Sequence, residues 1–290
     1  MIEGTITKGV GGFYYVKTLE GKTFQCKARG LFRKDGITPY VGDRVKIELT
    51  DETEAYIINI LPRKNKFVRP PIANVDCFLI TVAVRKPNPN FYIIDKFLTA
   101  AEYQHTDIII CLNKLDLAAP CEVKDFIDVY KDIYPVVGLS GKTGEGLPDL
   151  LRLFRGRKCA FAGPSGTGKS TLLNCLYSGV QAETAEVSEK TEKGKHTTRH
   201  VELFELPDGS MIYDTPGFTS FEVLDADEEE LEHLYPEMEE FLGKCKFHNC
   251  RHIKEPGCRI RLAVDEGEIV NSRYDSYVRQ LKEIQEKRKF

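Results

Sequence analysis

Short segments of alternating apolar and polar residues fill the first 68 residues of the chain, separated by turn-forming pairs such as Gly11-Gly12 and Glu20-Gly21. Alternation with a period of two is typical of strands that have one buried face. Five such strands in so short a segment predict a compact all-β barrel, for which the OB type is the leading candidate. The expected strands are Ile2–Thr7, Phe13–Thr18, Thr23–Ala28, Arg44–Leu49 and Ala55–Ile60.

The pattern changes after the stiff connector Arg69-Pro70-Pro71, where continuous apolar runs begin to alternate with helical stretches. Continuous apolar runs are typical of parallel strands that are buried on both faces of a sheet. An α/β domain with a mostly parallel sheet is therefore expected over residues 72–221. The expected strands are Cys77–Val84, Ile108–Leu112, Pro135–Leu139 and Cys159–Ala162, and the expected helices are Ile93–Tyr103, Val123–Lys131, Leu147–Phe154 and Lys169–Tyr177.

The last part of the chain has a third character. It is acidic over Asp225–Glu232, then rich in cysteine, and it ends in the helix-like segment Tyr274–Lys287. A chain of 290 residues suits two or three domains. We therefore expect three: a barrel over residues 1–68, the α/β domain over 72–221, and an α-helical domain over 222–290.

Composition adds that neither a membrane-spanning segment nor a secretory signal is expected. The formal net charge is −3, 29% of residues are charged, and no apolar stretch reaches the roughly 20 residues that a membrane span needs. The first residues lack a basic segment followed by an apolar run, so no secretory signal is expected. We expect a cytoplasmic monomer that has no membrane partner.

Charge is distributed unevenly, because residues 1–70 contain eight Lys and five Arg against eight Asp and Glu, a local net charge of +5. A small barrel with a positive face is a common platform for nucleic acid, since neutralising phosphates releases counterions. An ordinary solvated face is the alternative. The basic residues in two clusters are Lys27, Arg29, Arg33 and Lys34, and Arg63, Lys64, Lys66 and Arg69.

A glycine-rich segment that follows the expected strand at Cys159–Ala162 has the pattern of a phosphate-binding loop. Its glycines let backbone N–H groups turn toward phosphates, Lys169 can reach the terminal phosphates, and the Ser170 hydroxyl can bind Mg²⁺. A helix begins at the end of the loop, so its N-terminal dipole faces the anion. The candidate phosphate-binding residues are Gly163, Pro164, Ser165, Gly166, Thr167, Gly168, Lys169, Ser170 and Thr171.

A second segment, Asn113-Lys114-Leu115-Asp116, has the pattern of a guanine-binding loop. The carboxylate of Asp116 can accept hydrogen bonds from both N1–H and the exocyclic amine of guanine, whereas adenine offers no such pair. Asn113 would hold the loop and the base edge, and the Lys114 stem would pack along the ring. Taken alone the tetrapeptide could also be a surface turn. Ser140, Gly141 and Lys142, at the end of the next strand, would form a loop that supports the base.

Two further segments complete a nucleotide site. Asp214-Thr215-Pro216-Gly217 follows the expected strand Met211–Tyr213, which places Asp214 to hold Mg²⁺ through water and the Gly217 amide near the γ-phosphate. Between the phosphate loop and Asp214 lies Gly194-Lys195-His196-Thr197-Thr198-Arg199, a candidate switch I segment. Either Thr197 or Thr198 should be the second protein ligand to Mg²⁺.

The guanine loop precedes the phosphate loop, which is the reverse of the usual order in GTPases. The chain therefore resembles the circularly permuted GTPases, and with its barrel and cysteine cluster it is similar to the ribosome small-subunit-dependent GTPase family (RsgA) along nearly its whole length. The segments that add to the resemblance are Ala28–Lys34, Pro39–Asp43, Arg69–Asp76, His196–Arg199 and Glu255–Cys258. The resemblance implies GTP hydrolysis that is stimulated by the small ribosomal subunit and its rRNA during late maturation of that subunit.

The residue after the switch II glycine Gly217 is Phe218, where many GTPases have a glutamine that positions the attacking water. A phenyl ring cannot orient water by hydrogen bonding, so slow intrinsic turnover is expected. His196 is the best candidate within the chain for a catalytic group, because a neutral imidazole can align water near neutral pH. A solvent-facing switch histidine is the alternative interpretation.

Three of the nine cysteines fall within fourteen residues as Cys245-x4-Cys250-x-His252-x5-Cys258. Three thiolates and one imidazole have the number and softness of ligands for a closed tetrahedral Zn²⁺ site, which supports folding and is not catalytic. His248 competes with His252 as the nitrogen ligand, and the family pattern favours His252. The basic neighbours of the cluster are a candidate RNA-facing surface: Lys244, Lys246, Arg251, Arg259 and Arg261.

Two other functions remain compatible with parts of this sequence. A nucleotide-gated RNA-binding or scaffold protein, in which hydrolysis is incidental, would need the same nucleotide segments. A metabolic kinase with a phosphate-binding loop would need an acceptor pocket, and it would leave Asn113–Asp116 unexplained.

Overall fold

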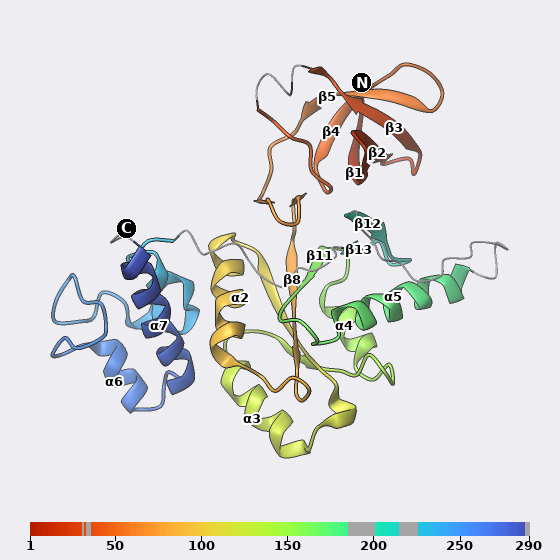
Figure 1. Cartoon of the computed structure of the whole chain (residues 1–290). Helices are drawn as coiled ribbons and strands as arrows, with labels where there is room; N and C mark the ends of the chain where they lie inside the picture. Colours follow the sequence, from red (N-terminus) through yellow and green to blue (C-terminus); the bar gives the residue numbers. More distant parts are fainter. Residues whose placement is uncertain (31, 33–35, 185–200, 215–225, 288–290) are drawn as a thin grey trace. The chain divides into compact units, whose positions relative to one another are not determined.

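The protein's structure is a computed structural model that describes residues 1–30, 32, 36–184, 201–214 and 226–287, with the backbone alone over 178–184. Two compact units make up the chain, whose elements are shown in sequence colours in Figure 1. The first unit comprises Met1–Leu79, Pro148–Ala162 and Lys169–Thr219, and the second comprises Ile80–Leu147, Gly163–Gly168 and Ser220–Phe290. The boundaries expected for three domains stay a prediction.

A closed five-stranded barrel begins the first unit, as the alternating pattern predicts. Neighbouring strands pair in the order β1-β2-β3-β5-β4, and β4 pairs with β1 to close the barrel; only the β3–β5 pair is parallel. Side chains that face inward at every second position are fully buried, among them Ile6, Val16 and Ile57. The strands are β1 (Ile2–Val10), β2 (Phe13–Thr18), β3 (Thr23–Ala28), β4 (Arg44–Leu49) and β5 (Glu54–Ile60).

The rest of the first unit includes a β-hairpin that pairs with the barrel. β12 pairs antiparallel with β13, and β13 pairs parallel with β11. β12 also meets barrel strand β1 at Lys8 and Glu202, whose side chains form an ion pair of 3.0 Å. The elements are β6 (Lys66–Phe67), β7 (Ile72–Ala73), α4 (Leu147–Leu153), β11 (Lys158–Ala162), α5 (Lys169–Thr184), β12 (Glu202–Glu205) and β13 (Met211–Asp214).

The second unit is built on buried parallel strands followed by helices. β8 (Cys77–Ala83) continues from the first unit into the second and is buried at every position. β9 is buried at all but its first residue, and β10 pairs with it in parallel. The other elements here are α2 (Phe91–Tyr103), β9 (Asp107–Asn113), η1 (Leu115–Leu117), α3 (Pro120–Tyr130) and β10 (Val136–Gly138).

The C-terminal part of the second unit is helical, as expected. Its core contains Leu231, Tyr235, Met238, Tyr277 and Leu281, all with no exposed surface. None of the described helices is both long and apolar enough to cross a bilayer. The elements are η2 (Leu231–Leu234), η3 (Pro236–Phe241), α6 (Arg259–Asp265) and α7 (Asn271–Lys287).

A buried arginine joins α7 to α2, two helices that lie side by side in Figure 1. Arg273 has no exposed surface, and its Nη1 donates to Asp95 Oδ1 on α2 (2.6 Å). Its Nε and Nη2 donate to the two carboxylate oxygens of Glu237 on η3 (2.6 and 3.1 Å). The guanidinium also lies 4.7 Å from the ring centroid of Tyr235. The C-terminal helices are therefore held to α2 by a charge network in which Arg273 and Asp95 are fully buried and the Glu237 side chain is 8% exposed.

The substitution Arg273→Met should lower the free energy of unfolding by about 3–5 kcal/mol, because it leaves the carboxylates of Asp95 and Glu237 buried without their cation. Denaturant titration of the full chain measures this loss. Lys282→Met, an exposed position on the same helix, is the matched control and should change stability by no more than about 0.5 kcal/mol. Adding Asp95→Asn to Arg273→Met should recover part of the loss; equal stability of Arg273→Met and the control would contradict the network.

Candidate functional site

Asn113 joins three loops of the second unit. It ends β9, and only 2% of its surface is exposed. Its Nδ2 donates to the backbone oxygen of Thr167 (2.8 Å), and its Oδ1 accepts from the backbone N–H of Gly141 (3.0 Å). One amide side chain thus brings together three segments that the sequence predicts for nucleotide binding: residues 113–116, 140–142 and 163–168.

Asp116 and Lys114 are held by the other two loops. Ser140 Oγ donates to Asp116 Oδ1 (2.8 Å) and accepts from the backbone N–H of Thr143 (3.2 Å), so the orientation of the carboxylate is fixed. Lys114 has a left-handed backbone with φ of 68°, and its Nζ donates to the backbone oxygen of Gly166 (2.7 Å) and to that of Lys86. The Lys114 stem therefore runs from the 113–116 loop to the phosphate loop, while Lys142 is exposed.

Two glycines let the phosphate loop approach its neighbours closely. Gly163 has φ of +133°, and a Cβ there would lie 2.4 Å from the backbone oxygen of Thr81 on β8. Gly168 has φ of +97°, and a Cβ there would lie 2.3 Å from Asn113 Nδ2. A side chain at either position would displace the loop, so the requirement for glycine follows from contacts as well as from backbone conformation.

The remaining residues of the phosphate loop turn its backbone. Thr167 is buried, and its Oγ1 donates to the backbone oxygen of Pro164 (3.0 Å), while Ser165 is exposed. Lys169 then begins α5, and burial lowers the pKa of this lysine to about 8. A bound anion would raise the pKa of Lys169 again, because an opposite charge favours the charged form. Ser170 and Thr171 follow on the first turn of α5, and both are exposed.

Asp214 is the last residue of β13 and is half-buried. His196, Thr197 and Thr198 lie outside the described residues, as do Gly217 and Phe218. The roles that the sequence gives these five positions therefore stay predictions.

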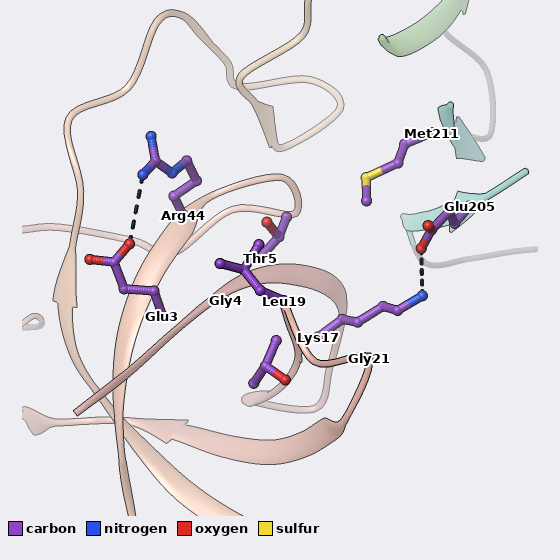
Figure 2. A pocket seen from close by; sticks show the side chains of 10 residues that line it. Glu3, Gly4, Thr5, Lys17, Leu19, Gly21, Arg44, Glu205 and Met211 are labelled. Atoms are coloured by element: carbon purple, nitrogen blue, oxygen red, sulfur yellow. Dashed lines mark hydrogen bonds and ion pairs between the residues drawn. The ribbon is translucent and has the colours of Figure 1, made fainter. Parts of the chain in front are cut away.

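A cavity of about 300 Å³ in the first unit is lined by none of these loop residues and lies between the barrel and the β12–β13 hairpin (Figure 2). Its cations already have partners: Lys17 pairs with Glu205 of β12, and Arg44 pairs with Glu3 (3.7 Å). The cavity offers no glycine-rich loop with inward N–H groups, so its size alone does not make it the nucleotide site.

Four side chains with metal-binding atoms meet in the C-terminal part of the second unit. Their ligand atoms all lie within 4.8 Å of one another. His252 Nδ1 is 3.5 Å from Cys245 Sγ and 3.3 Å from Cys258 Sγ, and the two sulfurs are 4.0 Å apart. The residues of this cluster are Cys245, Cys250, His252 and Cys258. His248, the alternative nitrogen ligand, is exposed and does not belong to the cluster.

Glu232 supports the cluster from outside, and sequence reasoning missed it. Its Oε2 lies 3.0 Å from His252 Nε2, the ring nitrogen that faces away from the cysteines. A carboxylate on that nitrogen fixes the tautomer and the ring orientation so that Nδ1 can bind a metal. Backbone N–H groups of Arg259 and Arg261 donate to the sulfurs of Cys245 (3.3 Å) and Cys258 (3.5 Å) and stabilise thiolates there. Cys245, Cys250, His252 and Cys258 could therefore hold a metal ion in a closed site.

Two sequence-family models match the chain. The model described as RsgA GTPase matches residues 60–224, and the model described as RsgA N-terminal domain matches residues 3–57. Curated relatives named small ribosomal subunit biogenesis GTPase RsgA include one from Caldanaerobacter subterraneus subsp. tengcongensis, 46% identical over 99% of this chain and 97% of the relative. Another, from Agathobacter rectalis, is 44% identical over 99% of both chains.

Solved structures agree with these matches. YjeQ from Thermotoga maritima has a TM-score of 0.86 and 34% sequence identity, and the alignment covers 98% of both chains. YloQ, described as a circularly permuted GTPase, has a TM-score of 0.84 and 36% identity over 99% of this chain and 96% of its own. The permuted order of the 113–116 loop and the phosphate loop thus has a counterpart among known folds.

Proposed function

The chain belongs to the RsgA family of GTPases, and we propose that it binds the small ribosomal subunit and hydrolyses GTP to GDP and phosphate during late maturation of that subunit. The pair of hydrogen bonds made by Asn113 is the observation that supports this proposal, since it joins the loop that carries Asp116 to Thr167 and Gly141 of the other two loops. Adenine lacks the adjacent pair of N1–H and amine donors, so a kinase specific for ATP would leave the Asp116 carboxylate unexplained.

Each residue of the proposed site has a defined task toward GTP. Asp116 accepts from the guanine base, and Asn113 holds the base-supporting loop at Gly141. Backbone N–H groups of the phosphate loop and Lys169 bind the phosphates. Ser170 and one of Thr197 and Thr198 would bind Mg²⁺ directly, Asp214 would hold it through water, and the Gly217 N–H would contact the γ-phosphate.

We assign the metal of the cysteine cluster as Zn²⁺. A tetrahedron of thiolates and imidazole at zinc distances of roughly 2.0–2.3 Å has edges of about 3.3–3.8 Å. The nitrogen–sulfur separations of 3.5 and 3.3 Å fit those edges, and the separation of 4.0 Å between the sulfurs of Cys245 and Cys258 is slightly longer. The ion would join segments that are too short to form a core of their own.

The proposed rRNA contact of the barrel rests on fewer residues than its charge suggests. Arg63 is bound to both carboxylate oxygens of the buried Asp43 (2.7 Å each), so it stabilises the barrel. Arg29 pairs with Glu48. Lys27 and Lys66 are exposed, and the described residues give neither of them an ion pair. Among the described residues these two lysines are our candidates for phosphate contacts, and Arg33 and Lys34 of the predicted cluster lie outside the described residues. We propose that the protein is a monomer that works with ribosomes in the cytoplasm.

Phosphate release from GTP by the full chain with Mg²⁺, measured alone and with purified small or large ribosomal subunits, tests the function. Turnover should be slow alone and should rise only with small subunits. Equal turnover with both subunits would favour a nucleotide-gated scaffold in which hydrolysis is incidental, and the absence of any stimulation would contradict the proposal.

We propose that His196 positions the attacking water, because Phe218 cannot. His196→Ala should slow turnover stimulated by small subunits on the order of 10²–10⁴-fold, while affinity for a non-hydrolysable GTP analogue stays unchanged. Single-turnover hydrolysis and equilibrium binding on the same preparation separate the two effects. His233→Ala, an exposed histidine of η2, is the control. Unchanged stimulated turnover in His196→Ala would remove this residue from the mechanism.

A further inference from the structure

The loop between Cys245 and Cys250 presents an exposed aromatic ring. Phe247 is 41% exposed, and only Tyr56 shares this property among the aromatic residues that the structure describes. Every other described aromatic residue of the C-terminal helices is buried or half-buried. Burial of a phenyl ring is favourable, so this ring lacks the contact that its apolar surface favours.

The backbone around Phe247 is fixed at several points. The N–H of Lys246 donates to Gly257 O (3.2 Å), and the N–H of Cys250 donates to Phe247 O (3.3 Å). Cys245 and Cys250 at the two ends belong to the metal cluster. A ring on so constrained a loop loses little conformational entropy when it binds a partner.

Charge limits what that partner can be. Lys244 and Lys246 flank the ring, both are exposed, and the described residues give neither an ion pair; Lys246 Nζ lies 5.6 Å from the ring centroid. By contrast, Arg251 pairs with Glu229 (3.0 Å), and Arg259 pairs with Glu266 (2.8 Å). Of the basic residues expected around the cysteine cluster, Lys244, Lys246 and Arg261 thus stay exposed without an ion pair among the described residues, and the two lysines lie on the loop that carries Phe247.

We propose that this loop, residues 244–249, binds single-stranded RNA, with Phe247 stacked on an unpaired base and Lys244 and Lys246 on the adjoining phosphates. Aromatic rings stack on any exposed base face, whereas bases within a duplex are covered by their neighbours. The inference rests on the proposed function, because it specifies how the C-terminal helices would contact rRNA. A protein partner is the competing occupant, and it would use the exposed Leu262 and Val270 as well as Phe247.

The absence of tryptophan from the chain allows a local test. Phe247→Trp in the full, metal-loaded chain introduces the only indole, whose emission can be excited selectively over that of the tyrosines. A poly(U) oligonucleotide should quench it, because quenching requires contact between indole and base. A duplex RNA of equal length should not. Leu262→Trp, at an exposed apolar position of α6, is the matched control and should respond to neither RNA.

Affinity gives an independent readout. Phe247→Ala should weaken binding of the oligonucleotide on the order of 5- to 150-fold at constant salt dependence, and metal content should be unchanged. Lys246→Ala should instead lower the dependence of the logarithm of affinity on the logarithm of salt concentration by about one. Unquenched Phe247→Trp fluorescence at saturating poly(U) would overturn the proposal, as would equal quenching by duplex RNA. If small subunits still stimulate GTP hydrolysis by the wild-type chain in that case, only this inference fails; loss of that stimulation is a failure of the proposed function itself.

Discussion

Cys250→Ser should release the metal and destabilise the C-terminal helices, while the chain still binds GTP. Structural zinc contributes on the order of 10–16 kcal/mol of apparent binding free energy in zinc-finger peptides, and a serine hydroxyl cannot replace a thiolate at neutral pH. The buried core around Tyr235 and Tyr277 retains part of the stability, so hydrogen exchange should show selective loss of protection over residues 226–287. Elemental analysis, exchange and nucleotide affinity on the same preparation measure the three effects. His248→Ala, an exposed histidine within the same segment, should keep the metal.

Cys250→Ser also tests whether the cysteine cluster is coupled to the segment predicted to contact the γ-phosphate. The chain leaves β13 at Asp214 and reaches the C-terminal helices after residues 215–225, which include the predicted γ-phosphate contact Gly217. A permuted order therefore connects this segment covalently to the cysteine cluster. Subunit binding should fall in Cys250→Ser, and with it the stimulated part of GTP hydrolysis. A variant that lost its metal and kept full stimulation would show that the cluster is only a local support.

Predictions that depend on local pattern agree with the structure. Alternating residues predict the barrel strands, and continuous apolar runs predict β8 and β9. The reason is that the spacing of apolar residues along a strand depends on whether one face or both faces are buried. Loop motifs could be located for the same reason, since the Asn113 and Gly163 segments each follow a buried strand. β12 was missed, because its sequence Glu-Leu-Phe-Glu neither alternates between apolar and polar residues nor forms a long apolar run.

Pairings between distant residues could not be predicted. Glu232 lies twenty residues before His252, within an acidic segment where no local pattern distinguishes one carboxylate from another. Arg273 is on a helix rich in charged residues, where arginine is usually exposed, yet it has no accessible surface because Asp95 and Glu237 come from other elements. Arg63, counted in the sequence with the RNA-binding charges, is instead bound to Asp43. Such pairs can be identified only from the tertiary structure, because the periodic pattern of apolar residues carries no information about contacts between distant segments.

Asp116→Asn should exchange guanine for xanthine specificity. The carboxylate, oriented by Ser140, is the group proposed to accept both N1–H and the exocyclic amine of guanine. Hydrogen bonds to a charged group contribute about 1.5–3 kcal/mol each, so losing the pair should weaken GTP on the order of 10²–10⁴-fold. An asparagine amide can donate to the carbonyl that xanthine carries in place of that amine and can accept from N1–H. The preference ratio should therefore change by more than either affinity does.

Equilibrium titration of the full chain with GTP and with xanthosine triphosphate measures the exchange of specificity directly. Asp125→Asn makes the same chemical change at an exposed position of α3 and should leave both affinities as they are in the wild type. Ser140→Ala should have an intermediate effect, because it removes only the hydroxyl that orients the carboxylate. If Asp116→Asn keeps the full preference for GTP, Asp116 does not bind the base. Its hydrogen bond with Ser140 would then only stabilise the loop.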